Sequence, residues 1–110
     1  MRLAYSFSLK GNKMADENGS QVLPAGKWVR VAAGVSGVVT IQNKGALEIQ
    51  IAGLASGASE PVGGGGAIDF PRDALVSGEL LSNLFPGVAN PSEIWAFSGG
   101  GIGEVLISHG

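Results

Sequence analysis

The sequence predicts an all-β fold, a small antiparallel β-sandwich or jelly-roll-like barrel of about seven or eight strands. Composition is the first reason: of 110 residues, 19 are glycine, 45% are hydrophobic and only 15% are charged. Average proteins contain about 7% glycine and about 25% charged residues. The second reason is that short runs of alternating apolar and polar residues recur between turn-forming residues. Such a chain suits short strands and tight turns around the single core that this length supports.

An N-terminal strand or arm is predicted over residues 3–9, where large apolar residues alternate with small ones. The residues that share one face there include Leu3, Tyr5 and Phe7. A polar stretch follows, so we divide the chain into an arm with its linker over 1–20 and a sandwich domain over 21–110. Such an arm could add a strand to the sheet edge of a neighbouring subunit. Because Met14 opens Met-Ala-Asp-Glu, an ordinary bacterial protein start, the sequence leaves Met1 and Met14 open as the natural start.

Three strands are predicted next, at 27–32, 38–42 and 46–52. The residues Asn-Lys-Gly at 43–45 read as a tight turn, because Asn and Gly tolerate positive φ. The second and third of these strands are therefore expected to pair as a hairpin in a meander with one solvated face. The residues expected to point inward on the third strand are Leu47, Ile49 and Ile51, and those expected to point outward are Glu48 and Gln50.

The middle of the chain is predicted as a loop over 53–67, which contains a run of four glycines. A short strand is expected over 67–70, where it ends before a proline. Residues 74–85 are ambiguous between strand and helix, because a glycine weakens the helical pattern that the last seven residues could form as two turns.

The end of the chain reads as a β-hairpin, with strands at 94–98 and 102–108 and a glycine turn at 99–101. Trp95 and Phe97 share one face of its first strand, and Ile94 and Ala96 on the other face are also apolar. This pattern fits a central strand of a sandwich, or a strand with one face on the core and the other in an interface. Trp28 raises the same question, since exposed aromatic residues also serve as platforms for sugars.

Charge and cysteine content exclude several classes of function. The net charge is −2 and the pI is about 5.2, with no basic stripe, so direct binding to nucleic acid is disfavoured. The absence of cysteine excludes disulfides and thiolate metal sites. No apolar run approaches the roughly 18 residues of a membrane span, and no signal peptide is predicted.

No catalytic, cofactor or metal site is predicted. His109 has no nucleophile or orienting acid near it in sequence, so we expect a solvated terminal side chain. The oxygen-bearing residues at 16–18 do not match a calcium-loop spacing. Asp69 and Asp73 could form a carboxylate pair only if they converged, and local pairing with Arg72 is the expected arrangement. We therefore expect a protein that is not an enzyme.

Four segments carry a family resemblance: residues 26–32, 39–45, 47–51 and 94–101, the last followed by a closing strand. Over about residues 21–108, the chain resembles small β-sandwich virion proteins of tailed bacteriophages, of the head-decoration, cement or head-fibre type. The resemblance implies a capsid decoration protein that stabilises the head by multivalent packing. Its partners would be copies of itself, in a homotrimer or another symmetric oligomer, and the major capsid protein. It would be made in the bacterial cytoplasm and reside on the capsid surface.

The resemblance also implies an interface, and an alternative function. Its candidate residues are Leu3, Tyr5, Phe7, Gly64, Gly65, Leu84, Phe85, Trp95 and Phe97. The alternative is a fibre or tail-tip module that binds host-surface glycan. Head, tail and fibre locations are not distinguished by the sequence.

Overall fold

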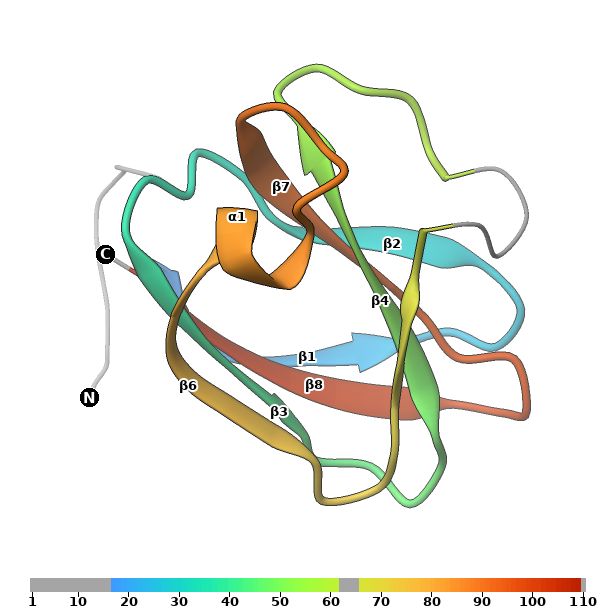
Figure 1. Ribbon diagram of the computed structural model, residues 1–110. Helices are drawn as coiled ribbons and strands as arrows, with labels where there is room; N and C mark the ends of the chain where they lie inside the picture. The colour runs from blue at the N-terminus through green and yellow to red at the C-terminus, as the bar shows by residue number, and fades with distance from the viewer. Residues whose placement is uncertain (1–16, 62–65, 110) are drawn as a thin grey trace, which may run out of the picture.

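Two four-stranded antiparallel sheets pack face to face in the computed structural model, which describes residues 17–61 and 66–109 (Figure 1). One sheet has the order β1-β8-β3-β6 and the other has the order β2-β7-β4-β5. The strands are β1 (Glu17–Leu23), β2 (Trp28–Ala32), β3 (Val38–Asn43), β4 (Ile49–Ala55), β5 (Ile68–Phe70), β6 (Leu75–Leu80), β7 (Pro91–Phe97) and β8 (Gly103–His109), with one helix, α1 (Leu81–Leu84). The predicted all-β sandwich is confirmed.

The order of the strands identifies the sandwich as a jelly roll. Strands that follow one another in the chain lie in opposite sheets, except that β5 lies in the same sheet as β4. β8 pairs with both β1 and β3, and β7 pairs with both β2 and β4. This interleaving of two Greek keys over eight strands defines the jelly-roll fold.

The predicted closing hairpin is wrong, although both of its strands exist. β7 and β8 lie in opposite sheets, so the glycine-rich residues between them cross from one sheet to the other. The predicted meander fails in the same way, because β3 and β4 also lie in opposite sheets. Alternation identifies the apolar face of each strand, and that face meets the core equally well in a hairpin or across a sandwich.

A buried asparagine builds the corner between β3 and β4. The Asn43 side chain is 1% exposed, and its Nδ2 donates to the carbonyl oxygens of Leu47 at 2.8 Å and Phe70 at 3.0 Å. Its Oδ1 accepts a hydrogen bond from the backbone N–H of Gly45 at 3.0 Å. These bonds satisfy the buried amide and join β3 to β5 of the other sheet. The predicted hairpin turn is therefore a corner of the sandwich.

The crossing from β7 to β8 requires a glycine for reasons of space. A methyl group on Gly103 would lie 3.0 Å from the Ser98 Oγ and 3.3 Å from the Ile49 Cγ2. Ser98 cannot move away easily, because it is fully buried and its Oγ donates to the carbonyl of Gly101 at 2.6 Å. A larger residue at position 103 would push the two sheets apart at this end.

Several boundaries differ from the prediction. β1 begins at Glu17, so the domain boundary predicted at residue 21 falls inside a strand. The ambiguous 74–85 segment contains β6 and the single turn of α1. His109 is 4% exposed at the end of β8, between β1 and β3, so the expectation of a solvated side chain is wrong. Tertiary pairing on both sides of β8 buries a residue that local sequence places near the chain end.

The core lies between the sheets and is aliphatic. Alternate residues of the central strands face it, as the sequence pattern predicted for Ile49 and Ile51. Leu47, also predicted to face inward, is only half-buried. The core residues with at most 2% exposure are Leu23, Val31, Val39, Ile41, Ile49, Ile51, Ile94, Ala96, Val105 and Ile107. Burial of each large aliphatic side chain stabilises the fold by about 1.5–3 kcal/mol before entropy is counted.

Candidate functional site

The predicted interface residues fall in different environments. Leu3, Tyr5, Phe7, Gly64 and Gly65 lie outside the described residues. Leu84 is half-buried at the margin of the core, and Trp95 and Phe97 are half-buried on the outside of the sandwich. Phe85 is 4% exposed and belongs to the core cluster, which leaves it almost no surface for a partner. Its position after α1 turns the ring inward, onto Gly53 of β4.

The outer surface of the β2-β7-β4-β5 sheet carries an aromatic face, which we define as Trp28, Arg30, Glu93, Trp95 and Phe97. Trp28 pairs with Phe97 and Arg30 pairs with Trp95 in the register of β2 and β7. The Trp28 and Phe97 ring centroids are 5.3 Å apart with an interplanar angle of 38°, within the range of favourable aromatic pairs. β7 lies in the middle of its sheet, between β2 and β4, with Ile94 and Ala96 in the core, which agrees with the first of the two predicted arrangements.

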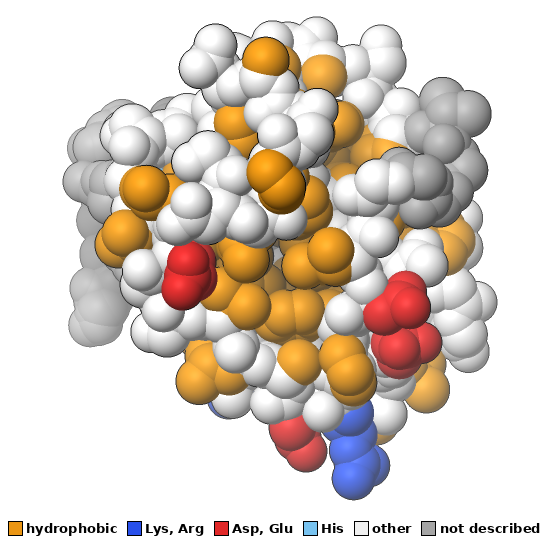
Figure 2. Space-filling model, viewed as in Figure 1, with side chains coloured by type: hydrophobic (Ala, Val, Ile, Leu, Met, Phe, Trp, Pro, Cys, Tyr) orange, Lys and Arg blue, Asp and Glu red, His pale blue; other side chains and the backbone are white. Residues whose placement is uncertain are grey.

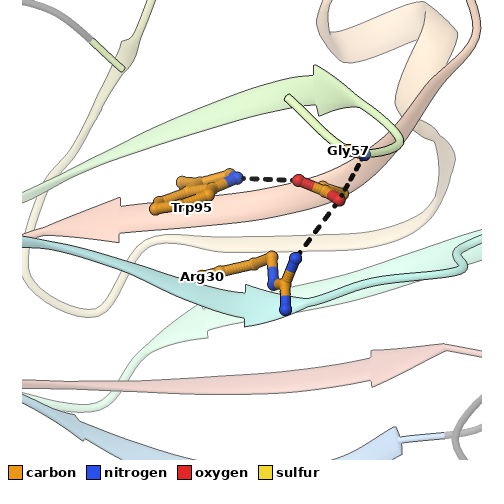
Figure 3. A network of polar contacts seen from close by, with 4 residues as sticks. Arg30, Gly57 and Trp95 are labelled. Atoms are coloured by element: carbon orange, nitrogen blue, oxygen red, sulfur yellow. Dashed lines mark hydrogen bonds and ion pairs between the residues drawn. The ribbon is translucent and has the colours of Figure 1, made fainter. Parts of the chain in front are cut away.

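Three donors converge on Glu93 within this face (Figure 3). Its Oε2 accepts hydrogen bonds from the backbone N–H of Gly57 at 3.0 Å and from the Arg30 guanidinium at 3.5 Å. Its Oε1 accepts a hydrogen bond from the Trp95 indole N–H at 3.1 Å. Glu93 is only 3% exposed, so these contacts compensate a carboxylate removed from water. The network holds the Trp95 ring and ties the segment after β4 to the sheet.

The same contacts decide the protonation state of Glu93. Burial alone would raise the pKa of this carboxyl, because it disfavours the charged form. The hydrogen bonds from Gly57 and Trp95, together with the nearby charge of Arg30, outweigh burial and hold the pKa below its ordinary value. Glu93 is therefore an anchor that stays ionised at neutral pH. Sequence reasoning did not single it out, although it alternates with Trp95 and Phe97 on one strand face.

An open groove of about 590 Å³ lies at the Trp28 end of the aromatic face. It is lined by Gly26, Lys27, Trp28, Gln50, Glu60, Pro61 and Phe97. These residues come from the turn before β2, from β4, from the segment after β4 and from β7. Gln50 is the register partner of Phe97 on the neighbouring strand, so both side chains face outward. The volume falls within the range of about 300–1,000 Å³ typical of small-ligand sites.

The outer surface of the other sheet is different in character. We define its aliphatic face as the outward residues Val22, Val38, Leu75, Leu80 and Leu106. The first four are 44–66% exposed. Thr40 and Ser77 lie between them, with their hydroxyl oxygens 3.4 Å apart. Among the outward side chains described on this sheet, Glu104 is the only ionisable one. Solvent-exposed sheet faces normally carry more charge, so this face is suited to contact with another surface.

The edge strand β6 is protected against pairing with another strand. Its register with β3 shifts at Val39 and Thr40, beside Gly78, whose φ is +73°. Glu79 is the register partner of Val39, whose side chain is in the core, so Glu79 lies on the inner side of this edge yet remains exposed. A bulge and an inward charge are devices that block edge-to-edge association. Association of copies is therefore better suited to the faces than to this edge.

A further apolar surface lies on the open side of the sandwich, between β5 and β6. Figure 2 shows hydrophobic side chains gathered in the centre of this side, flanked by acidic groups. Half-buried residues of β5, β6, α1 and the segment after α1 pack against the core here, and they include Ile68, Val76, Leu84 and Val88. They close the core where no strand joins the two sheets.

The residues considered for chemistry do not form a catalytic group in the described part of the chain. Arg72 pairs with Asp73 at 3.7 Å, as expected, whereas the Asp69 Oδ1 accepts a hydrogen bond from Gln50 at 3.3 Å. No group of three or more potential metal ligands occurs among residues 17–61 and 66–109. No helix long and apolar enough to cross a membrane occurs there either.

Comparison of the chain with family models, with curated proteins and with solved structures gave no match.

Proposed function

We propose that this protein is a structural component of a tailed-phage virion, a decoration protein that stabilises the capsid by packing on its surface in many copies. The aliphatic face carries the proposal. Jelly rolls occur in viral capsid and other binding domains, and the resemblance of residues 21–108 to phage virion proteins points the same way. Fold alone does not imply function, so the argument depends on the surface.

The energetics of the aliphatic face favour repeated, weak contacts. Fully burying a Val or Leu side chain contributes about 1.5–3 kcal/mol. Four of the side chains are 44–66% exposed, so covering the exposed part contributes about 1 kcal/mol each, or about 4 kcal/mol together. Association costs about 4–15 kcal/mol in lost freedom of motion. One copy would therefore bind weakly, and an oligomer on a repeating lattice would bind strongly through multivalency.

The test uses particles of the phage that encodes this chain, made without the gene and supplied with purified protein. We expect the wild-type chain to be oligomeric by light scattering, to bind the deficient particles and to raise the temperature at which they release DNA. Leu75→Lys should weaken binding at least tenfold, because the ammonium group would lose water at the contact. At 58% exposure, Leu75 can be replaced without disturbing the core.

Ile102→Lys is the matched control. Ile102 is 71% exposed but lies in the crossing before β8, not on the sheet. We expect this variant to bind particles like the wild type. A chain that stays monomeric and does not bind the deficient particles would show that the proposed function is wrong.

A further inference from the structure

We infer that the groove beside Trp28 is a binding site for a neutral saccharide. It lies on the sheet opposite to the aliphatic face, so both surfaces can be engaged at once. The inference does not rest on the proposed function, because the groove is complete within one chain. It also applies whether the chain sits on a head, a tail or a fibre.

The aromatic side chains provide the apolar part of the site. Trp28 is 8% exposed and Phe97 is half-buried, and both line the groove from the outer surface of their sheet. Aromatic rings carry a negative face, which favours contact with the weakly positive C–H groups of a sugar ring. The half-buried Phe97 ring and the small exposed part of Trp28 therefore give the groove an aromatic wall that a sugar ring could contact.

The polar side chains of the groove define the class of ligand. Lys27 can donate hydrogen bonds and the Glu60 carboxylate can accept them, and the Gln50 amide, whose Nε2 already donates to Asp69, can still do both. A sugar hydroxyl also donates and accepts, so it can use this mixed set. Lys27 and Glu60 carry opposite formal charges, and Asp69, hydrogen-bonded to Gln50, adds a negative charge beside the groove, so an anion gains no net attraction there. A strongly anionic ligand would meet Glu60, and a cationic one would meet Lys27.

Hydrogen bonds tie the chain to the sheet near both walls of the groove. Glu60 and Pro61 belong to the segment after β4, which begins with the bend that Gly57 anchors to Glu93. The opposite wall starts at Gly26, whose N–H donates to the carbonyl of Ser98 at 2.8 Å. Both walls are thus tied to residues of the sheet or its end. Preorganisation of this kind lowers the entropy lost on binding.

The experiment is calorimetric titration of the full chain with neutral oligosaccharides: cellotriose, maltotriose, chitotriose and 1,4-linked galactotriose. Trigalacturonic acid serves as the anionic counterpart of galactotriose. We expect at least one neutral probe to bind with a Kd of about 10 mM or lower and to change tryptophan fluorescence. Absence of binding by every neutral probe, or tighter binding of the acid than of any of them, would overturn the inference.

Variants locate the binding. Trp28→Ala and Gln50→Leu should each weaken it at least tenfold, whereas Val22→Thr should leave it within twofold, because Val22 is 66% exposed on the outer surface of the other sheet. If Trp28→Ala does not fold, Gln50→Leu decides, since Gln50 is on the surface. Unchanged affinity in Gln50→Leu would refute the assignment. So would a Trp28→Ala variant that changes only the oligomeric state, which would assign the groove to contacts between copies.

Discussion

Replacing Gly53 by alanine tests the packing that turns Phe85 into a core residue. Gly53 lies in β4, directly beneath the Phe85 ring. A methyl group at this position would lie 2.8 Å from Cγ and 2.9 Å from Cε2 of that ring, and closer still to Cδ2. Ordinary contacts of such a carbon are 3.4–4 Å, so the ring must move. At 4% exposure it has little room to do so.

The size of the effect follows from two opposing contributions. Overpacking a core costs about 1–3 kcal/mol. Replacing a glycine in a strand by alanine stabilises the folded state by about 0.5–1 kcal/mol, because the unfolded chain then has less conformational entropy to lose on folding. We therefore expect Gly53→Ala to lower the free energy of unfolding by about 1–2 kcal/mol. At about 4–8 °C per kcal/mol for a domain of this size, Tm should fall by roughly 5–15 °C.

The assay is urea and thermal unfolding followed by circular dichroism. Gly87→Ala is the control, because no atom lies within 4 Å of the added methyl group and its φ is not positive. This control should stay within about 0.5 kcal/mol of wild type. Combining Gly53→Ala with Phe85→Leu should destabilise less than the sum of the single changes, by about 1 kcal/mol, because the smaller side chain makes room. A neutral Gly53→Ala, or strict additivity, would refute the packing described for this ring.

Because its folded-state pKa is lowered, Glu93 contributes stability that is fully present above the ordinary pKa of 4.5 and is lost as pH falls through the folded value. Glu93→Gln should therefore cost about 1–3 kcal/mol at pH 7 and much less at pH 3 in urea titrations, and an equal cost at both pH values would contradict the network. Asn43→Asp should lower the free energy of unfolding by about 3 kcal/mol or more at pH 7, because it places a carboxylate against the carbonyl oxygens of Leu47 and Phe70. A loss below about 1 kcal/mol would contradict these hydrogen bonds. Gly78→Ala places a side chain at a φ of +73° and should lower the free energy of unfolding by about 1–2 kcal/mol in the same titration. An unchanged free energy of unfolding would show that residue 78 does not adopt this left-handed conformation in the bulge.

The nature of several strands was accessible from the sequence because burial along a strand is a local property, although β1 begins in a stretch predicted as linker and β6 lies in a stretch that was ambiguous. Alternation placed Ile49 and Ile51 in the core and Gln50 outside it, and the structure agrees. It also put Trp95 and Phe97 on one face of their strand. Those predictions needed only the two-residue period of the pleat.

The partners of each strand were not accessible in this way. Both predicted hairpins join strands that the jelly roll places in opposite sheets, and a glycine-rich connection suits either arrangement. His109 shows the same limit, since only pairing of β8 with strands from the other end of the chain buries it.

The sequence by itself determined that the chain is all-β, that it carries little charge, and that its strands are aliphatic with a few aromatic residues. Only the tertiary structure decided that Glu93 anchors Trp95 and that Trp28, Gln50 and Phe97 border one groove. The physical reason is that periodicity records how each strand meets the core. A site is formed by side chains brought together from distant strands, and their distances depend on the order of strands in the sheets.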